Sequence, residues 1–453
     1  MPCPQQMPQL GGVALLMAMD GRQSRQPRAA AAGMKWRGAA IGTLPFIPMR
    51  RTVAVMPDTP AAAEGALRPT MALPLGLLAA AGFLSSAGAR VVDPLLHAIA
   101  TDFTVTVPQV SIVIAAFTLP YGLNQLILGP VGDRFGKLRV MLGALVGYAL
   151  FTGLCALTTS LPGLTLMRAC AGAASAGLIP VGMAYIGDAV PYEQRQVTLS
   201  RFLTGIVLAQ TLAGPVGGVF GQYVGWRGVF LVLSGLAVAL SVTLARRIRG
   251  LPDRRSRGRM FNPDNYVRMA THPVSRLVLL AAALDGALFV GCFPYIAPYL
   301  HEHFGLDYAP AGLILACFGL GAWAYTRTAR PMLARLGEGG MVLAGGVLMA
   351  AGLLLSAVGG GWGVFIPVEL ALGLGFFMLH GVLQARATEL LPQARATAVA
   401  TFACLLFLGQ SVGALGVGAI IARFDYPAAF AADAVAILLL TIWLTGIIRR
   451  PAV

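Results

Sequence analysis

The sequence predicts an all-α integral membrane protein with twelve transmembrane helices, arranged as two pseudo-symmetric halves of six. Three observations predict this fold class: a train of apolar stretches, a one-sided distribution of Lys and Arg, and an internal repeat. The composition agrees, because 57% of the 453 residues are apolar and 11% are charged, whereas soluble globular proteins have about 25% charged residues. Too little polar surface remains for a soluble enzyme, a soluble nucleic-acid binder or a disordered scaffold.

The apolar stretches begin at Leu73 and are each about 20 residues long, which is enough to cross the hydrocarbon core of a bilayer. Each must be helical, because lipid offers no hydrogen-bond partner to a free backbone group. The twelve stretches cover 73–94, 108–131, 139–158, 162–187, 198–222, 228–247, 275–299, 309–329, 340–358, 363–385, 396–421 and 427–448. The longest polar interruption, 246–276, divides them into six and six.

Residues 1–70 differ in composition from the rest of the chain, being rich in Ala, Pro, Gln and Arg without a sustained apolar period. We expect a disordered cytoplasmic extension here. A misassigned start site is the alternative, because Met56 and Met71 stand just before the first span. The other expected domains are an N-terminal six-helix half at 71–247, a cytoplasmic basic linker at 248–274 and a C-terminal six-helix half at 275–450.

The cations fall almost entirely on one side of the predicted membrane. If the N-terminus is cytoplasmic, 29 of the 33 Lys and Arg residues lie in cytoplasmic segments. Arg227 and Arg423 then lie in external loops, and Arg90 and Arg168 lie inside spans. Because Lys and Arg collect in cytoplasmic loops, both termini are expected in the cytoplasm, with the chain in a bacterial inner membrane. The formal net charge of +15 then predicts contact with anionic membrane lipid and no nucleic-acid partner.

The two halves repeat with a constant offset of 201 residues. Isolated matches of Gly and Pro arise by chance in such a sequence, but a constant offset over four helices and three loops does not. The repeat therefore predicts two parallel halves related by an axis along the membrane normal. The matched pairs are Pro130 with Pro331, Arg134 with Arg335, Gly136 with Gly337, Gly172 with Gly373, Asp188 with Glu389, and Pro191 with Pro392.

The loop after the second span carries the strongest motif, Gly129-Pro-Val-Gly-Asp-Arg-Phe-Gly-Lys-Leu-Arg139. It resembles the cytoplasmic signature of the major facilitator superfamily, G-x-x-x-D-R-x-G-[RK]. The resemblance implies a gating latch between the halves, which breaks during the transport cycle. The copy in the second half has Ala334 in place of the acid, so the latch is assigned to the first half. The latch residues are Gly129, Asp133, Arg134, Gly136, Lys137 and Arg139.

Two further elements inside the spans resemble motifs of the same superfamily. Arg168-Ala-Cys-Ala-Gly172 resembles its R-x-x-x-G element, which implies that Arg168 takes part in proton transfer. The alternative is an Arg side chain that snorkels to the membrane interface. The fifth span resembles the G-P-x-x-G-G motif of drug:proton antiporters, with one residue fewer after the proline, and small residues equally suit close helix packing. The residues of this helix-packing motif are Gly205, Gly214, Pro215, Gly217 and Gly218.

Ionisable residues inside spans are costly and are therefore functional candidates. Asp93 ends the first span in a segment that resembles the start of many bacterial efflux members, and Arg90 can pair with it from one turn earlier. That pair is either a structural ion pair or part of the lining of the cavity. Asp285, near mid-membrane, is a candidate for proton or substrate coupling, or else a neutral or paired acid that fixes helix packing. Asp285, Arg168 and Asp93 are the proton-coupling candidates, and Glu369, the repeat partner of Arg168, is expected at the external mouth.

The cavity candidates combine these charged groups with uncharged polar residues of the spans. Each uncharged one equally suits an interhelical hydrogen bond. His380 is the one that titrates near neutral pH when unperturbed. The cavity candidates are Arg90, Tyr121, Asn124, Gln125, Gln210, Glu369, His380 and Gln384.

No motif for covalent chemistry occurs in the sequence. A Walker A loop, zinc-ligand spacing and a nucleophile elbow are all missing. The six cysteines include no CxxC pair and no cluster with histidine, so neither a disulfide framework nor a metal site is expected. We therefore expect no enzyme activity, no catalytic residue and no cofactor, with a proton gradient as the energy source.

The resemblance covers about residues 71–450 and implies a twelve-helix secondary transporter that works by alternating access. The activity it implies is proton-driven efflux of a small, partly apolar organic substrate, and a monomer is expected. One alternative is a proton-coupled uptake symporter for an organic acid or other metabolite, in which the Arg residues would bind the anion. An alternative of another class is a non-transporting membrane receptor or scaffold.

Overall fold

In the computed structural model, residues 74–248 and 263–448 are described, and their regular structure is helical, with no strand among these residues. The predicted extension 1–70 and the central part of the predicted linker lie outside the described residues. Within the described ranges, ten helical segments are long and apolar enough to cross a membrane. Two of them, Val197–Ile248 and Tyr308–Val358, are 52 and 51 residues long. Because about 20 residues make one crossing, these two supply two passes each and bring the total to twelve.

The first half begins at α1 and ends with the long helix α8. Its elements are α1 (Leu75–Arg90), η1 (Asp93–Leu95), α2 (Leu96–Phe103), α3 (Val107–Val110), α4 (Ile112–Phe135), α5 (Lys137–Ala156), α6 (Leu161–Ser175), α7 (Leu178–Ala189) and α8 (Tyr192–Ile248). The second half follows the described part of the linker. Its elements are α9 (Pro263–Thr271), α10 (Pro273–Asp285), η2 (Gly286–Val290), η3 (Phe293–Tyr295), α11 (Ile296–Phe304), α12 (Tyr308–Val358), η4 (Trp362–Val364), α13 (Phe365–Ala387), η5 (Pro392–Ala394), α14 (Arg395–Arg423) and α15 (Tyr426–Ile448).

Glycines turn the chain where successive passes meet without a loop. Gly225 in α8 has φ 72°, and Gly337 in α12 has φ 64°. Gly136, between α4 and α5, has φ 100°. Side chains with a Cβ rarely adopt such positive φ values, so glycine suits these positions. Gly136 and Gly337 are partners in the 201-residue repeat, and the structure gives them the same task in the two halves.

Two spans continue through a break that the sequence analysis placed at or near their ends. The first passes from α1 through η1 to α2, and the seventh passes from α10 through η2 and η3 to α11. Pro94 and Pro294 stand in the two breaks, at the start of η1 and η3. Proline removes a backbone donor inside a helix but fits the first turn of the next one. The predicted ends at 94 and 299 are therefore too early, because helix resumes and runs to Phe103 and Phe304.

The predicted basic linker 248–274 contains a short helix that the sequence analysis did not predict. Helix α9 starts at a proline, carries Asp264 in its first turn and Arg268 in its last. Both charges complement the helix dipole. Met269 is its buried residue, whereas the side chains of Asp264 and Arg268 are exposed, and α9 packs against α10 and α14.

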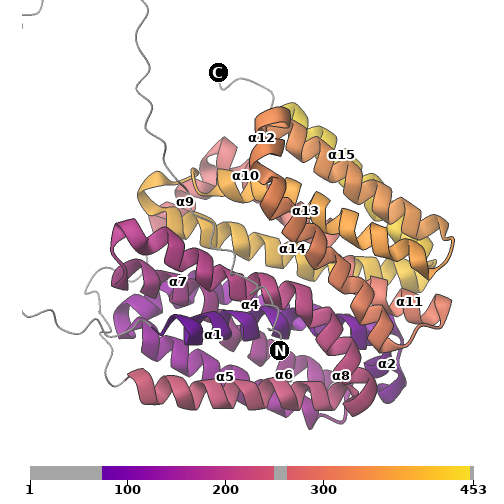
Figure 1. Cartoon of the computed structure of the whole chain (residues 1–453), viewed down its shortest axis with the longest axis horizontal. Helices are drawn as coiled ribbons and strands as arrows, with labels where there is room; N and C mark the ends of the chain where they lie inside the picture. Colours follow the sequence, from indigo (N-terminus) through magenta and orange to yellow (C-terminus); the bar gives the residue numbers. More distant parts are fainter. Residues whose placement is uncertain (1–73, 249–262, 449–453) are drawn as a thin grey trace, which may run out of the picture. The chain divides into compact units, whose positions relative to one another are not determined.

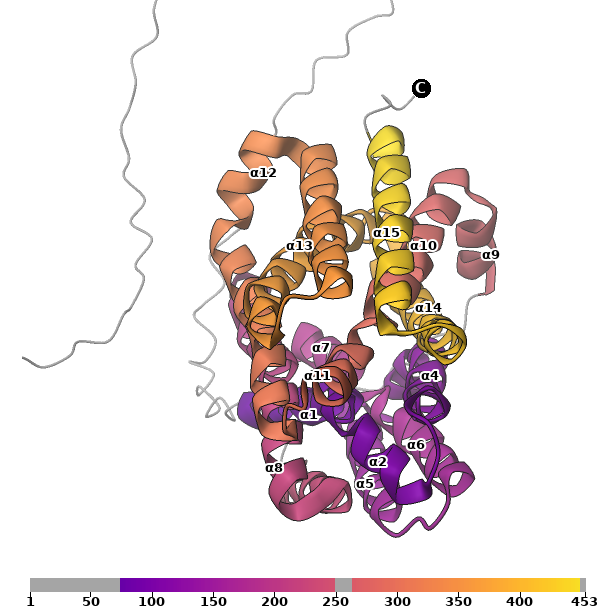
Figure 2. The same ribbon diagram turned by 90° about the vertical axis from the view of Figure 1, so that its right-hand side faces the viewer.

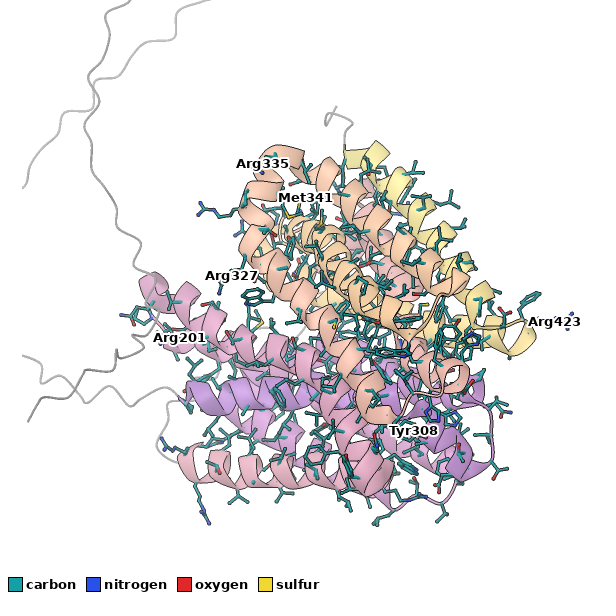
Figure 3. All side chains as sticks on the ribbon, turned by 45° about the vertical axis from the view of Figure 1, so that its right-hand side comes forward. Arg201, Tyr308, Arg327, Arg335, Met341 and Arg423 are labelled. Atoms are coloured by element: carbon teal, nitrogen blue, oxygen red, sulfur yellow. The ribbon has the colours of Figure 1, made fainter. Side chains whose placement is uncertain are left out.

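The two ends of the helix bundle differ in composition. One end, called the basic end, carries Lys137, Arg201 and Arg335. The opposite end, called the histidine end, carries His97 and His301. Figure 3 labels Arg201, Arg327 and Arg335 toward one side of the bundle, and Tyr308 and Arg423 toward the other. The predicted one-sided cation distribution thus corresponds to one physical end of the bundle.

The halves meet along two helix pairs, α4 with α14 and α8 with α12. Figure 1 shows α1–α8, in indigo to rose, below α13–α15, in orange to yellow, and Figure 2 shows α12 reaching down to α8. Small residues allow the α8–α12 contact: a Cβ on Gly312 would lie 2.5 Å from the carbonyl oxygen of Gly214. In the α4–α14 contact, a Cβ on Gly122 would lie 2.9 Å from the Cβ of Phe407. Any added side chain would therefore push the halves apart.

The internal repeat extends to individual backbone contacts. A Cβ on Gly172 of α6 would collide with the backbone of Phe117 in α4, at its carbonyl oxygen, carbonyl carbon and Cα. A Cβ on Gly373 of α13 would collide with the same three atoms of Phe318 in α12. Gly172 and Gly373 are 201 residues apart, and so are Phe117 and Phe318. The two halves are therefore built on one packing plan.

Candidate functional site

A narrow pocket lies between the two halves, with a cavity volume of about 10 Å³ in this conformation, which is about the room that one water molecule needs. The first half lines it with residues of α1, η1 and α8, and the second half lines it with residues of η3 and α12. Four of its residues are sequence-predicted candidates, whereas the three apolar ones were missed because an apolar residue facing a pocket looks like one facing lipid. The lining residues are Arg90, Asp93, Gln210, Gly214, Phe293, Leu315 and Phe318.

The Arg90–Asp93 pair forms the charged wall of this pocket. A guanidinium nitrogen of Arg90 lies 3.5 Å from a carboxylate oxygen of Asp93, and the Asp93 side chain is 2% exposed. The Arg90 guanidinium also lies 4.8 Å from the ring centroid of Phe293, in the second half. This cation–π contact joins the halves at the pocket. The predicted pairing of Arg90 with Asp93 is present, and it lies in the interior.

Arg168 is buried among the helices of the first half. Its Nη1 donates to the carbonyl oxygen of Gly88 at 2.9 Å, and its Nε donates to that of Val113 at 3.5 Å. The guanidinium lies 4.2 Å from the ring centroid of Phe117. With 1% of its surface exposed, Arg168 does not snorkel to the interface. It also acts electrostatically on Asp93, which links it to the pocket wall.

Asp285 and His380 form a buried pair within the second half. The carboxylate Oδ2 of Asp285 lies 2.8 Å from Nδ1 of His380, which joins α10 to α13. One hydrogen is shared in this contact: a protonated Nδ1 donates to the carboxylate, and a protonated carboxyl group donates to a bare Nδ1. His380 stacks on Phe376, with ring centroids 4.8 Å apart and an interplanar angle of 14°. The sequence analysis chose the two residues for different sets, and the structure brings them together as one site.

A cluster of phenylalanine rings connects this buried pair with the pocket. Phe293 and Phe318, which line the pocket, have ring centroids 4.9 Å apart. Phe289 joins Phe318 to Phe376, with centroids 5.8 Å and 5.0 Å away. Phe376 in turn carries the His380 ring. A continuous aromatic wall therefore runs from Arg90 to Asp285, through the interior of the second half.

The other cavity candidates occupy varied surroundings. Tyr121 is buried, accepts a hydrogen bond from Ser85 at 3.4 Å and packs edge-on against Phe407 of the second half, with centroids 4.7 Å apart. Asn124 donates to the carbonyl oxygen of Ala173 at 3.3 Å, which is an interhelical hydrogen bond. Gln125 is buried and Gln384 is exposed. None of these four lines the described pocket.

Glu369 lies near the start of α13, and its side chain is closed off from water in this conformation. The side chain is 0% exposed, and neither carboxylate oxygen has a hydrogen-bond partner among the described residues. Helices α12 and α13 pack closely around this position. Its expected place at the external mouth stays a prediction, because the halves are in contact in this conformation.

The helix-packing motif of α8 contacts both neighbouring helices. A Cβ on Gly205 would lie 2.5 Å from the carbonyl oxygen of Ala79 in α1, and one on Gly217 would lie 2.5 Å from that of Val91. A Cβ on Gly218 would collide with the carbonyl oxygen of Tyr308 in α12. Gly214 faces α12 as well, and Pro215 lies inside the helix. These glycines set how closely α8 approaches its neighbours in both halves.

The latch motif is organised around Lys137. Its ammonium group lies 2.6 Å from an oxygen of Asp133 and 2.6 Å from an oxygen of Asp188. Both ion pairs stay within the first half. Arg134 lies over the ring of Phe135, and the remaining latch residues Gly129, Gly136 and Arg139 lie around the same turn, between α4 and α5. In the second half, Glu338 occupies the repeat position of Lys137 and pairs with Arg386 at 2.6 Å.

We expect Lys137→Met to lower the free energy of unfolding by only about 1 kcal/mol, because the two acids are half-exposed and water screens exposed ion pairs. Chemical unfolding in mixed detergent micelles measures the change. Lys137→Arg, which keeps the charge, is the matched control and should stay close to the wild type. A loss of several kcal/mol for the methionine variant would show that the cluster is shielded from water.

The sequence profile of the Major Facilitator Superfamily matches residues 78–278 and 277–453. The chain belongs to the major facilitator superfamily. This membership confirms the family and the two-half, twelve-helix fold that the sequence predicted. It also makes the chain a membrane transporter of a small molecule.

Relatives in the superfamily include bacterial transporters of low sequence identity. One is an uncharacterized MFS-type transporter, YceJ, of Bacillus subtilis (strain 168), 26% identical over 326 residues that cover 71% of this chain and 82% of the relative. Another is a chloramphenicol resistance protein of Streptomyces lividans, 26% identical over 256 residues that cover 56% of this chain and 65% of that protein.

Solved structures of superfamily transporters share the fold. A bacterial homolog of the human lysosomal transporter Spinster, in an inward-facing conformation, has a TM-score of 0.68 at 16% identity and covers 83% of this chain and 95% of its own. A D-xylose-proton symporter has a TM-score of 0.66 at 15% identity and covers 82% of this chain and 96% of its own. At these identities the likeness concerns the fold.

The histidine end of this superfamily transporter holds the halves together through polar contacts. Nδ1 of His97 in α2 lies 3.0 Å from a carboxylate oxygen of Glu302 in α11. The His97 and His301 ring centroids are 4.3 Å apart, and His301 stacks on Tyr308. The backbone N–H of Ala309 donates to the side chain of Gln222 at 3.0 Å. In this conformation the halves are in contact at the histidine end.

We expect His97→Ala to weaken this contact, because it removes the imidazole that pairs with the Glu302 carboxylate. Spin labels at Tyr223→Cys and Phe424→Cys, on exposed residues of different halves, measure the separation of the histidine end in a background without other cysteines. The widely separated population should increase roughly fivefold, as a partly exposed pair of about 1 kcal/mol implies. An unchanged distance distribution would show that this pair does not hold the halves together.

Proposed function

We propose that this transporter is a proton-driven efflux protein of the bacterial inner membrane, which carries a small, partly apolar organic compound outward in exchange for protons. The basic end then faces the cytoplasm, where Lys and Arg collect in membrane proteins. Substrate binds in the pocket between the halves. Rocking of the halves exposes the pocket first at the basic end and then at the histidine end.

The observation that carries the proposal is the buried Asp285–His380 pair. The two side chains lie 2.8 Å apart, at 2% and 10% exposure, on helices that are 95 residues apart in sequence. A carboxyl group and an imidazole are the side chains that hold and release protons near neutral pH, and ionisable groups in spans mark proton relays. For packing alone, apolar side chains of similar volume would avoid the cost of burying these groups.

The chemistry of the pocket supports an amphipathic substrate. Phe293 and Phe318 offer apolar, aromatic surface, whereas Gln210 offers both a donor and an acceptor. Arg90 and Asp93 neutralise one another, so a substrate with a full charge would compete with a pair already formed. This arrangement favours an uncharged compound with an aromatic or apolar body and a hydrogen-bonding group. One relative, from Streptomyces lividans, is a chloramphenicol resistance protein, which is in keeping with efflux of such compounds.

Uptake of an organic acid by symport is the second candidate, because Arg90 faces the pocket. An anion ligand requires free guanidinium donors. Arg90 pairs with Asp93, and Arg168 donates to two backbone carbonyl groups, whereas Nη1 of Arg90 and Nη2 of Arg168 have no hydrogen-bond partner among the described residues. An anionic substrate could use these donors, but it would have to compete with Asp93 for Arg90, so efflux is placed first.

Proton movement in energised inside-out vesicles tests the proposal. A pH-sensitive dye reports the acidic lumen, and a panel of neutral aromatic amides, lipophilic cations, sugars and organic acids is added one at a time. Efflux by antiport predicts that a compound accepted by the transporter drives protons out of the lumen, and that vesicles without the protein do not respond. If no compound does so, while an organic acid accumulates in intact cells only with a proton gradient, the symporter replaces the efflux proposal.

A further inference from the structure

Glu369 is a buried acid without a local partner. Its side chain is 0% exposed, and both of its oxygens lack a hydrogen bond among the residues the structure describes. An ionised carboxylate that accepts no hydrogen bond is very costly in such a place. The question is therefore whether the surroundings of Glu369 favour the ionised or the protonated carboxyl group.

The repeat answers this question, because Glu369 occupies the position that Arg168 occupies in the first half. The two residues are 201 positions apart, as are the glycines one turn later, Gly172 and Gly373. Both glycines pack against the same three backbone atoms of a phenylalanine, Phe117 and Phe318 respectively. The surroundings of residues 168 and 369 are therefore equivalent parts of one packing plan.

The position in the first half is built for a donor. Arg168 donates to the carbonyl oxygens of Gly88 and Val113. The repeat pairs Val113 with Ile314 of α12, and by this correspondence we expect a backbone carbonyl group of α12 near Glu369. A carboxylate can only accept hydrogen bonds, whereas a protonated carboxyl group has an O–H to donate. The surroundings inherited from the repeat thus suit the protonated form of Glu369.

Two ionisable groups of neighbouring helices act on Glu369. Arg90 of α1 acts on it electrostatically from the other half, and the Cys317 thiol of α12 interacts with it within the same half. Asp285 of α10 is paired with His380. Arg90 is therefore the cation that favours the carboxylate form. Its effect depends on how closely the halves approach.

We infer that Glu369 is a second proton-carrying residue of the transport cycle. In the conformation with the histidine end closed, its carboxyl group is protonated and bonds a backbone carbonyl of its own half. When the halves separate at the histidine end, water reaches the group, and its carboxylate takes a proton from external hydronium. Closing this end buries the protonated form. Substrate that binds from the basic end then displaces this proton to water at that end and leaves the carboxylate, which completes the inward transfer of one proton. Its use in transport rests on the proposed proton coupling, whereas its protonation does not.

Infrared spectroscopy of the membrane-reconstituted protein tests the protonation without any substrate. At neutral pH the wild type should show the carbonyl stretching band of a buried carboxylic acid, and Glu369→Gln should lack it. The amide of glutamine keeps a donor for the same carbonyl, so this variant should fold. Asp433→Asn, which removes a different buried acid of a span, is the matched control and should keep the Glu369 band. An identical band in wild type and Glu369→Gln overturns the inference.

Proton exchange tests the coupling to conformation. In a background without native cysteines, His97→Cys and Glu302→Cys are bridged by a short thiol-specific reagent, which fixes the histidine end closed. On transfer to heavy water, the deuterium shift of the Glu369 band should be slower by about tenfold or more in the bridged protein than in the unbridged one, because exchange requires opening. Equal rates overturn the inference.

The proposed function can fail separately from this inference. If no compound moves protons in the vesicles, but the Glu369 band is present and its deuterium exchange is slower in the bridged protein, proton-driven efflux is rejected and Glu369 remains a proton-carrying group. If a compound does move protons in the vesicles, but the Glu369 band is absent, proton-driven efflux stands and the inference about Glu369 is rejected.

Discussion

Asp285→Asn is expected to abolish substrate-driven proton movement in inside-out vesicles, down to the level of vesicles without the protein. The substitution removes a group that can gain and lose a proton at mid-span. It keeps both a carbonyl oxygen that can accept and an amide group that can donate at the place where Asp285 contacts Nδ1 of His380. The substitution should therefore remove proton transfer while it keeps the hydrogen bond that supports folding.

The stability cost of this substitution should be small beside the loss of coupling. A hydrogen bond to a charged group exceeds one between neutral groups by about 1 kcal/mol, which is the expected loss in free energy of unfolding. Exchange of labelled for unlabelled compound across the membrane, which needs no net proton movement, should continue in the variant. Both measurements use the compound that gives the largest dye response with the wild type.

Asp433→Asn is the matched control for Asp285→Asn. Asp433 is also a buried acid in a span, at 6% exposure on α15, and it does not touch His380 in the described structure. Its substitution should leave the dye response in place. If Asp285→Asn keeps the response of the wild type, Asp285 is not the coupling acid. If it loses exchange together with proton movement, Asp285 belongs to substrate binding.

The passes and their grouping could be predicted from the sequence because lipid imposes strict rules. A stretch that crosses the membrane must be apolar, long and helical, and these properties are local in the sequence. The breaks at Pro94 and Pro294 were harder, because proline ends one helix and suits the first turn of the next. Apolarity alone therefore ended the first span too early, although helix resumes at Leu96.

The candidate site could be predicted only in part, because its contacts join distant segments. Asp285 and His380 each stand out as polar groups in apolar spans, but no spacing rule connects residues 95 positions apart. Phe293 and Phe318 could not be predicted as pocket residues, because a phenylalanine that faces a pocket cannot be told from one that faces lipid by sequence alone. The repeat was the one long-range signal available, and it matched Arg168 with Glu369 before any contact was known.

Gly312→Val is expected to force the halves apart at the histidine end. A Cβ at this position would lie 2.5 Å from the carbonyl oxygen of Gly214 and 3.1 Å from the Cα of Gly218. These are backbone atoms of α8, which cannot rotate away as the end of a side chain can. The cost of overpacking is about 1–3 kcal/mol. Since 1.4 kcal/mol is a factor of ten, the conformation with this end closed should lose about one to two orders of magnitude in relative population.

Labels at Tyr223→Cys and Phe424→Cys report that loss as a shift of the distance distribution toward longer separations. Gly235→Val is the matched control, because it makes the same change in α8 where an added Cβ meets nothing within 4 Å. It should leave the distribution as in the wild type. A transporter must pass through both conformations, so Gly312→Val should also stop substrate-driven proton movement while the control does not. If Gly312→Val left the short distance dominant, α8 and α12 would have to be more compliant than their backbone contact implies.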